Sequence, residues 1–219
     1  MQTNFKPSGA GLLGLATQLP PYQLPQDLVR TNAKRILGAR YPDFERLTKS
    51  FENAGIDNRY SVVPFEWFET QQDWRSRTAA FLSGAVELFV DAANKALAAS
   101  KLQAEQIDTV VTVSSTGIAT PTLDARAMTR MGFRSNIHRV PVFGLGCAGG
   151  VTGLALATRL AAAAPGSKVL FVCLEACTLS FRDDRMQKAD IIATVLFGDG
   201  AAAACISTEG DRLCDLGEG

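Results

Sequence analysis

Residues 140–164 read VPVFGLGCAGGVTGLALATRLAAAA, and this stretch limits the possible folds more than any other part of the chain. A strand-like apolar run leads into a glycine-rich turn, and a helix follows the turn. Only Thr152, Thr158 and Arg159 interrupt the small and apolar residues of that helix. A helix that is apolar on every side is typical of the interior of a protein. We therefore predict a buried central helix behind a tight turn.

The turn contains a cysteine, Cys147, at the start of the predicted helix. The first-turn amide groups and the helix dipole favour an anion at this position, and so favour a thiolate. The thiolate is the nucleophilic form of cysteine, which makes Cys147 a candidate for covalent catalysis. The alternative is a structural role, because free cysteines are among the most buried residues and often only fill space.

A second interpretation of the same turn is a nucleotide-binding site. Gly144, Gly146 and Gly149 form the pattern G-x-G-x-x-G between a strand and a helix, as in a dinucleotide-binding domain. Glu175 ends the next apolar run, where an acidic side chain could hold a ribose. The place of the motif deep in the chain, and the cysteine inside it, weaken this alternative but leave it open.

The charge balance argues against a protein that binds nucleic acid or a membrane surface by electrostatics. The 219 residues include 22 basic and 22 acidic side chains, so the formal net charge is zero. Residues 140–158 carry no charge, but five glycines and a proline make them a poor membrane span. We expect no membrane span and no nucleic-acid partner.

The five cysteines are odd in number and lie mostly in apolar runs, so they predict neither a disulfide framework nor a secreted protein. A reducing cytoplasm is the expected location. Cys173 and Cys177 lie four residues apart, but no histidine pair accompanies them, so we expect no metal site.

Strand-like and helical patterns alternate along the chain, and this predicts a layered α/β fold with a mostly parallel sheet. Strands are expected at residues 11–18, 59–63, 107–113, 140–143, 168–174 and 201–206. Helices are expected at residues 26–37, 42–54, 73–99, 122–131 and 189–197, besides the central one. Residues 65–72 are interpreted as a surface helix or lid, residues 1–8 as a loose tail, and residues 215–219 as lacking a clear element. We expect a single domain over residues 1–219.

Four motifs in this order carry a resemblance to a known family. They are SSTGIATP at 114–121, GLGCAGG at 144–150, CLEACTLSFR at 173–182 and LFGDGAAA at 196–203. Together they resemble the type III polyketide synthases, the chalcone and stilbene synthase family of the thiolase superfamily. The resemblance is clearest over residues 107–206 and looser over residues 11–100. It implies a thiolase-like fold.

The resemblance also implies a chemistry. Cys147 matches the family's nucleophile, which takes an acyl group from a starter acyl-CoA and holds it as a thioester. Decarboxylation of malonyl-CoA then supplies an enolate that extends the chain, with CoA thioesters as substrates and no further cofactor. Phe197 matches the phenylalanine that gates the family's cavity at the mouth of the CoA tunnel. Cys177, Leu179 and Ser180 match positions that shape the cavity.

Three further residues are placed by the same resemblance. Thr120 matches the position from which plant members reach into the cavity of the partner subunit, which implies a homodimer. Ser115 lies in the same motif and is counted among the cavity residues. Arg59 lies where family members place a basic residue near the CoA phosphates. By local sequence alone, Phe197 is more simply interpreted as a core residue and Asp199 as part of an ordinary turn. On the same basis Ser115 belongs to a loop, and Arg59 is a surface residue.

One departure from the family concerns the catalytic partners of the cysteine. The family needs a histidine and an asparagine from its C-terminal half, which stabilise the thiolate and the developing oxyanion. The only histidine here, His138, lies nine residues before Cys147, roughly 25 Å or more away along an extended strand. We therefore expect His138 to be a surface residue. We expect the chain to be an N-terminal domain whose C-terminal half is absent, with little condensing activity alone.

Two other functions remain possible beside the dinucleotide-binding domain. One is a ketoacyl synthase III of fatty-acid synthesis, with the same nucleophile and a carrier-protein substrate. The other is a catalytically incomplete interaction domain that pairs with a separate partner. The sequence does not specify the starter unit or the number of extensions.

Overall fold

The computed structural model describes residues 9–37, 44–182 and 188–216, which form two compact units. The first unit is built from the described parts of residues 1–18, 85–174 and 201–219, and the second from those of residues 19–84 and 175–200. The second unit is therefore inserted into the first in two pieces of chain. No linker in the sequence marks this division, and the sequence predicted a single domain.

The first unit contains a six-stranded sheet in the order β5-β4-β6-β7-β1-β8. Its strands are β1 (Gly11–Gln18), β4 (Thr109–Val113), β5 (His138–Val142), β6 (Val169–Ala176), β7 (Asp199–Ser207) and β8 (Cys214–Asp215). β4 pairs in parallel with β5 and β6, while β1 pairs antiparallel with β7 and β8. The sheet is thus mixed, within the α/β layering that the sequence predicted.

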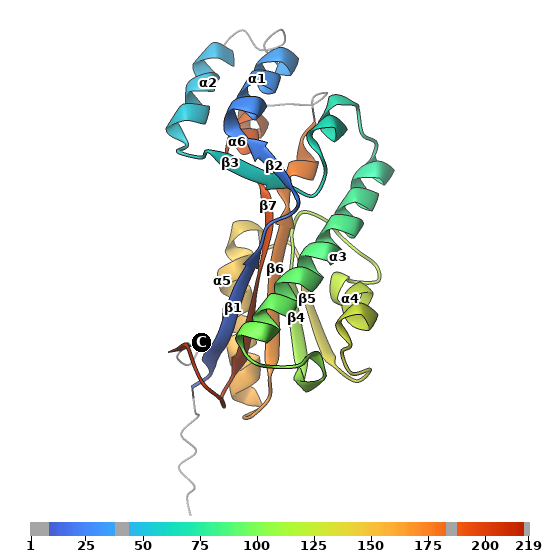
Figure 1. Ribbon diagram of the computed structural model, residues 1–219, viewed down its shortest axis with the longest axis vertical. Helices are drawn as coiled ribbons and strands as arrows, with labels where there is room; N and C mark the ends of the chain where they lie inside the picture. Colours follow the sequence, from blue (N-terminus) through green and yellow to red (C-terminus); the bar gives the residue numbers. More distant parts are fainter. Residues whose placement is uncertain (1–8, 38–43, 183–187, 217–219) are drawn as a thin grey trace, which may run out of the picture. The chain divides into compact units, whose positions relative to one another are not determined.

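Helices lie on both faces of this sheet (Figure 1). One face carries α5 (Gly149–Ala163), and the other carries α4 (Leu123–Met131) and the second part of α3 (Trp74–Ala99). The apolar side chains of β4 and β6 pack on both faces of the sheet, because successive side chains of a strand point in opposite directions. Val111, Val113 and Phe171 belong to the core cluster of α5, together with its Ala157 and Ala161.

α5 is buried on one side only, which differs from the predicted enclosure of this helix. Its buried positions are Gly149, Gly153, Ala157, Thr158 and Ala161. On its other side, Val151 is 77% exposed. The spacing of the buried positions is that of one helical face against a sheet. An all-apolar composition therefore does not enclose the helix within this chain.

The second unit combines a short two-stranded sheet with helices. β2 (Tyr22–Pro25) and β3 (Asn58–Ser61) pair antiparallel. The helices are α1 (Gln26–Leu37), α2 (Phe44–Asn53) and α6 (Lys188–Leu196), with the 3-10 turns η1 (Phe65–Glu69) and η4 (Cys177–Ser180). Ala33, Phe51, Ile191 and Val195 form the core between these helices.

Most predicted elements are present. β1 and α1 have the expected bounds, and α4 ends at Gly132, whose φ of 72° is the left-handed conformation that glycine favours at a helix end. η1 is a 3-10 turn within the segment interpreted as a surface helix or lid. β2 was not predicted, and β8 corrects the expectation that residues from 215 onward lack an element. Residues 1–8 and the start of the helix expected at 42–54 lie outside the described residues.

Candidate active site

Cys147 lies on a glycine turn that joins β5 to α5. Gly144 and Gly146 have φ values of 85° and 54°, in the region that side chains disfavour, so the backbone of this turn requires glycine. A 3-10 turn, η3 (Gly146–Ala148), carries the cysteine, and α5 begins at Gly149, two residues after Cys147. The Cys147 side chain is exposed. The structure thus presents the thiol at the start of the helix, as the sequence predicted.

The loop after β4 contacts this turn through Ser115. The amide of Gly146 donates a hydrogen bond of 2.9 Å to the Ser115 hydroxyl. Next to it, the Ser114 amide donates to the Val142 carbonyl at the end of β5. Both loops follow the ends of neighbouring parallel strands, which places a hydroxyl beside the residue that precedes the candidate nucleophile.

The start of α5 packs closely against the sheet. A Cβ atom on Gly149 would lie 2.7 Å from Val113 Cγ1, so a side chain at this position would push the helix away from β4. Close helix–strand packing is also a role of the last glycine in a dinucleotide-binding turn. In the described sheet, however, β5 lies at one end of the strand order and the β1 pairs are antiparallel. A dinucleotide-binding domain has its glycine turn after a strand inside a parallel sheet, which is not the position of β5. Glu175, the acid that would hold the ribose, is half-buried in β6.

The second unit contains a cavity of about 170 Å³. Its apolar lining includes the rings of Phe65, Phe68, Phe181 and Phe197. The aromatic segment at residues 65–69 therefore lines a cavity, a contribution that the interpretation as a surface helix or lid did not specify. The remaining lining is mixed and includes charged side chains such as Arg182 and Asp190, so the cavity suits a ligand with an apolar or aromatic part and a polar part.

Three of the predicted cavity residues, Phe197, Cys177 and Ser180, line this cavity. Phe197 is 45% exposed at the end of α6, so it is not the core residue that its local sequence alone favoured. Leu179 is buried beside them, and its carbonyl accepts a hydrogen bond of 2.5 Å from Arg77 Nη1. These residues come together because η4 and α6 both belong to the second unit.

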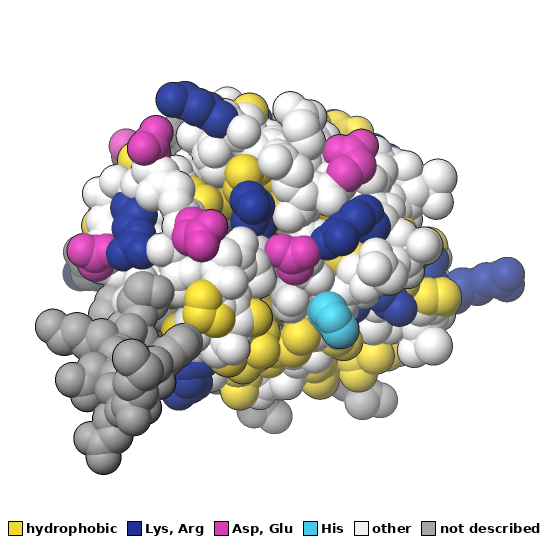
Figure 2. Space-filling model, turned by 90° about the horizontal axis from the view of Figure 1, so that it is seen from below, with side chains coloured by type: hydrophobic (Ala, Val, Ile, Leu, Met, Phe, Trp, Pro, Cys, Tyr) yellow, Lys and Arg dark blue, Asp and Glu magenta, His cyan; other side chains and the backbone are white. Residues whose placement is uncertain are grey.

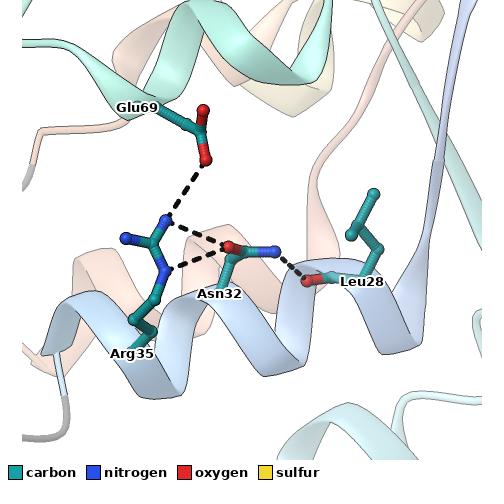
Figure 3. A network of polar contacts seen from close by, with 4 residues as sticks. All are labelled: Leu28, Asn32, Arg35 and Glu69. Atoms are coloured by element: carbon teal, nitrogen blue, oxygen red, sulfur yellow. Dashed lines mark hydrogen bonds and ion pairs between the residues drawn. The ribbon is translucent and has the colours of Figure 1, made fainter.

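Polar side chains at the cavity join α1 to η1 (Figure 3). Asn32 and Glu69 are among its lining residues. Arg35 donates from Nε and Nη2 to the Asn32 side-chain oxygen and forms an ion pair of 3.4 Å with Glu69. Asn32 in turn donates to the Leu28 carbonyl at 2.9 Å. This network is exposed, so it contributes little stability, but it gives one side of the cavity a polar boundary.

Arg59 is a buried residue of β3, with 7% of its surface exposed. Its Nη1 atom donates to the Phe197 carbonyl at 3.1 Å and also to the Thr194 carbonyl. Burial lowers the pKa of Arg59 to about 10, against the opposing effect of the Asp199 charge. The CoA contact expected from the resemblance stays a prediction.

Sequence reasoning missed Asp199, which it interpreted as part of an ordinary turn. The side chain is 5% exposed and accepts hydrogen bonds from the Val62 amide at 2.9 Å and the Thr178 amide at 2.8 Å. The Thr178 hydroxyl donates a third, at 2.7 Å. Burial raises the pKa of Asp199, while these hydrogen bonds and Arg59 act in the opposite direction. The only signal in the sequence was an acid between two glycines.

The remaining predicted residues lie at the surface of the first unit. Thr120 is exposed, and its carbonyl accepts a hydrogen bond of 3.2 Å from Arg126 Nη2. His138 is exposed at the start of β5, whereas Cys147 follows the end of that strand. Figure 2 shows the histidine in cyan on a face where positive and negative side chains are interspersed. The described residues include no cluster of His, Cys, Asp and Glu suited to a metal, and none of their helices is long and apolar enough to cross a membrane.

Comparison with known proteins identifies the family. A sequence model of the N-terminal domain of chalcone and stilbene synthases matches residues 8–210. The chain therefore belongs to the chalcone and stilbene synthase family. A putative chalcone synthase from Bacillus subtilis is 33% identical over 205 residues, which cover 91% of this chain and 56% of the relative. A 1,3,6,8-tetrahydroxynaphthalene synthase from Streptomyces peucetius subsp. caesius is 37% identical over 198 residues, covering 89% and 52%.

Solved structures agree with the family. The crystal structure of 1,3,6,8-tetrahydroxynaphthalene synthase from Streptomyces coelicolor, a bacterial type III polyketide synthase, matches with a TM-score of 0.86 at 27% identity. The match covers 91% of this chain and 57% of that one. The fold is thus the thiolase-like α/β fold of these enzymes. The chain spans about half the length of the curated relatives it matches.

Proposed function

We propose that this chain supplies the nucleophilic cysteine and part of the acyl cavity of a type III polyketide synthase. Cys147 attacks the carbonyl carbon of an acyl-CoA, the bond from that carbon to the CoA sulfur breaks, and CoA leaves as its thiol. Malonyl-CoA then loses CO₂ to give an enolate, which attacks the acyl thioester and releases the Cys147 thiolate. The product is an acyl-CoA longer by two carbons.

The observation that carries this proposal is the turn itself, in a chain of this family. It presents an exposed thiol two residues before a 15-residue helix, whose dipole favours negative charge at that end. The Ser115 hydroxyl accepts a hydrogen bond from the Gly146 amide and so restrains the turn. A nucleophile held in one orientation reacts faster than a mobile one, because less freedom is lost at the transition state.

Supporting features complete the proposal. The aromatic cavity beside Phe197 and Cys177 accepts the acyl group, and Arg59 is the candidate for contact with CoA. The five free cysteines suit a reducing cytoplasm. The homodimer, with Thr120 at the subunit contact, and the histidine and asparagine of the second half are proposed from the resemblance to the family.

The test is acylation of the 219-residue chain by a series of acyl-CoA thioesters, followed by mass spectrometry of its peptides. We expect a stable acyl adduct on Cys147 that Cys147→Ala abolishes. Cys214 is the matched control, because it is also exposed, and Cys214→Ala should leave the Cys147 adduct unchanged. Equal labelling of both cysteines would show ordinary surface reactivity and contradict the proposal.

Adding malonyl-CoA to the acylated chain, with and without the C-terminal half of a relative, then tests condensation. We expect an extended product only when that half is present. A ketoacyl synthase would instead require the malonyl group on a carrier protein, so the two extender forms separate these alternatives.

A further inference from the structure

The last turn of α6 is held by a buried arginine from another element. The final carbonyls of a helix have no partner within it. Arg59 of β3 donates through Nη1 to one of them, the Thr194 carbonyl, and to the carbonyl of Phe197, the residue that follows the helix. The contacts span 135 and 138 residues of sequence. The backbone of Phe197 is thereby fixed directly by Arg59, while its ring lines the cavity.

Asp199 fixes the same segment from its other side. It accepts hydrogen bonds from Val62, just after β3, and from both the amide and the hydroxyl of Thr178 in η4. The Thr178 hydroxyl is also 3.0 Å from the Ser61 hydroxyl. Because η4 carries Cys177 and Ser180, one buried network positions two walls of the cavity.

Gly198, the residue between Phe197 and Asp199, allows this segment to lie close to β3. Gly198 lies so close to β3 that a Cβ atom there would be 3.3 Å from the Cβ of Arg59 and 3.5 Å from the Tyr60 amide nitrogen. Even the Cβ atom of an alanine would make tight contact with β3 here, so the backbone of Gly198 lies against that strand. Phe197, Gly198 and Asp199 therefore act as one unit held against that strand.

Burying Arg59 lowers the stability of the fold, so stability alone does not explain why an arginine occupies this position. Within the described part of the chain, its buried Nε and Nη2 atoms have no hydrogen-bond partner. Burying polar donors without partners is unfavourable, and burying a charge more so. Residues that break the rules of stability in this way are characteristic of functional sites.

We infer that Arg59 is a positioning residue that holds Phe197 as a wall of the cavity and thereby sets the size of the acyl group that the cavity admits. The role of the cavity in binding acyl groups rests on the proposed function, whereas the restraint on Phe197 does not. This assignment rests on the Nη1 contacts with the end of α6 and does not depend on the CoA contact proposed for the same residue.

The test uses Cys177, a thiol in the same cavity, as the reporter. The rates of its alkylation by N-methylmaleimide and by the larger N-phenylmaleimide are measured by peptide mass spectrometry. In the wild type, the larger reagent should react much more slowly at Cys177 than the smaller one. In Arg59→Met, the rate for the larger reagent should rise about tenfold or more, as expected for the loss of hydrogen bonds from a charged donor.

The size ratio distinguishes positioning from general destabilisation. Cys147 and Cys214 are exposed references in the same molecule, and their ratios should not change. Cys205 is fully buried in the first unit, so its labelling reports loss of that fold. Arg59→Lys keeps a donor and should lie between the wild type and Arg59→Met. Arg75→Met removes an exposed arginine of the second unit that does not line the cavity, and it should leave the ratio within about twofold, as a surface substitution.

Thr178→Val is the second variant, for the case that Arg59→Met does not fold. It removes one hydroxyl contact to Asp199, keeps the amide contact, and should shift the size ratio at Cys177 in the same direction by a smaller factor. An unchanged size ratio at Cys177 in every variant that protects Cys205 would overturn the inference. Acylation of Cys147 is a separate measurement, so its failure would count against the proposed function and not against the role of Arg59.

Discussion

The Ser115 hydroxyl accepts a hydrogen bond of 2.9 Å from the amide of Gly146, the residue before the candidate nucleophile. This contact joins the loop after β4 to the turn after β5. The turn also contains two glycines with positive φ, Gly144 and Gly146. Ser115 therefore helps to determine how Cys147 is presented.

Replacing this hydroxyl should slow acyl transfer to Cys147. Ser115→Ala leaves the Gly146 amide without its acceptor, at a cost of about 1 kcal/mol, which corresponds to about fivefold in the acylation rate. Ser115→Thr keeps a hydroxyl and should restore most of the rate. Ser135→Ala, an exposed serine of the same unit, controls for loss of any hydroxyl. Wild-type acylation kinetics in Ser115→Ala would show that the contact does not position the nucleophile.

Two glycines of α5 should respond in opposite ways to alanine. A Cβ atom on Gly153 would lie 2.6 Å from both Phe171 Cε2 and Val113 Cγ2, so Gly153→Ala should force the helix from the sheet and cost about 1–3 kcal/mol. On Gly150, the nearest atom would be Cys173 Sγ at 4.0 Å. Gly150→Ala should be neutral or stabilising by up to about 1 kcal/mol, because alanine favours helix. Urea unfolding measures both, and equal effects would contradict this packing.

A similar comparison separates a buried ion pair from an exposed one. Arg139 contacts Asp124 at 3.1 Å, and the Asp124 side chain is 1% exposed. Arg139→Leu leaves that carboxylate buried without its cation and should destabilise the first unit by about 2 kcal/mol. Arg130 makes shorter contacts, 2.7 and 2.8 Å, but its partner Glu87 is 59% exposed.

Arg130→Leu should therefore cost less than about 1 kcal/mol despite its better geometry. Circular dichroism of the two variants during urea unfolding gives both free energies. A larger loss in Arg130→Leu would mean that contact distance, and not burial of the acid, determines the strength of these pairs.

The sequence was sufficient where local signals agree with the packing. The bounds of β1 and α1 follow from apolar periodicity, and the end of α4 follows from Gly132. The turn of Cys147 was predictable because glycines with positive φ leave a strong composition signal. The family resemblance placed Phe197, Cys177 and Ser180 together, and the cavity of the second unit contains all three.

Long-range features were not predictable in the same way. Arg59 contacts carbonyls more than 130 residues later, and no local pattern encodes that distance. Asp199 resembles a surface turn until β3 and η4 surround it. The exposed face of α5 was missed because apolar composition indicates what a helix tolerates, not which of its sides this chain covers.

The burial of Asp199 leads to a prediction about pH. Burial raises its pKa above the ordinary value of 3.8, so between 3.8 and the higher folded value the folded state binds more protons than the unfolded chain. Stability from this group must therefore rise as the pH falls through that window. Asp199→Asn lacks the group, and the free-energy advantage of the wild type over this variant should grow on acidification.

Urea unfolding monitored by the fluorescence of Trp67 and Trp74, both in the second unit, measures this difference in the free energy of unfolding. Asp57→Asn removes an exposed carboxylate of the same unit as the control. A wild-type advantage that shrinks as the pH falls would mean that the hydrogen bonds to Asp199 outweigh its burial.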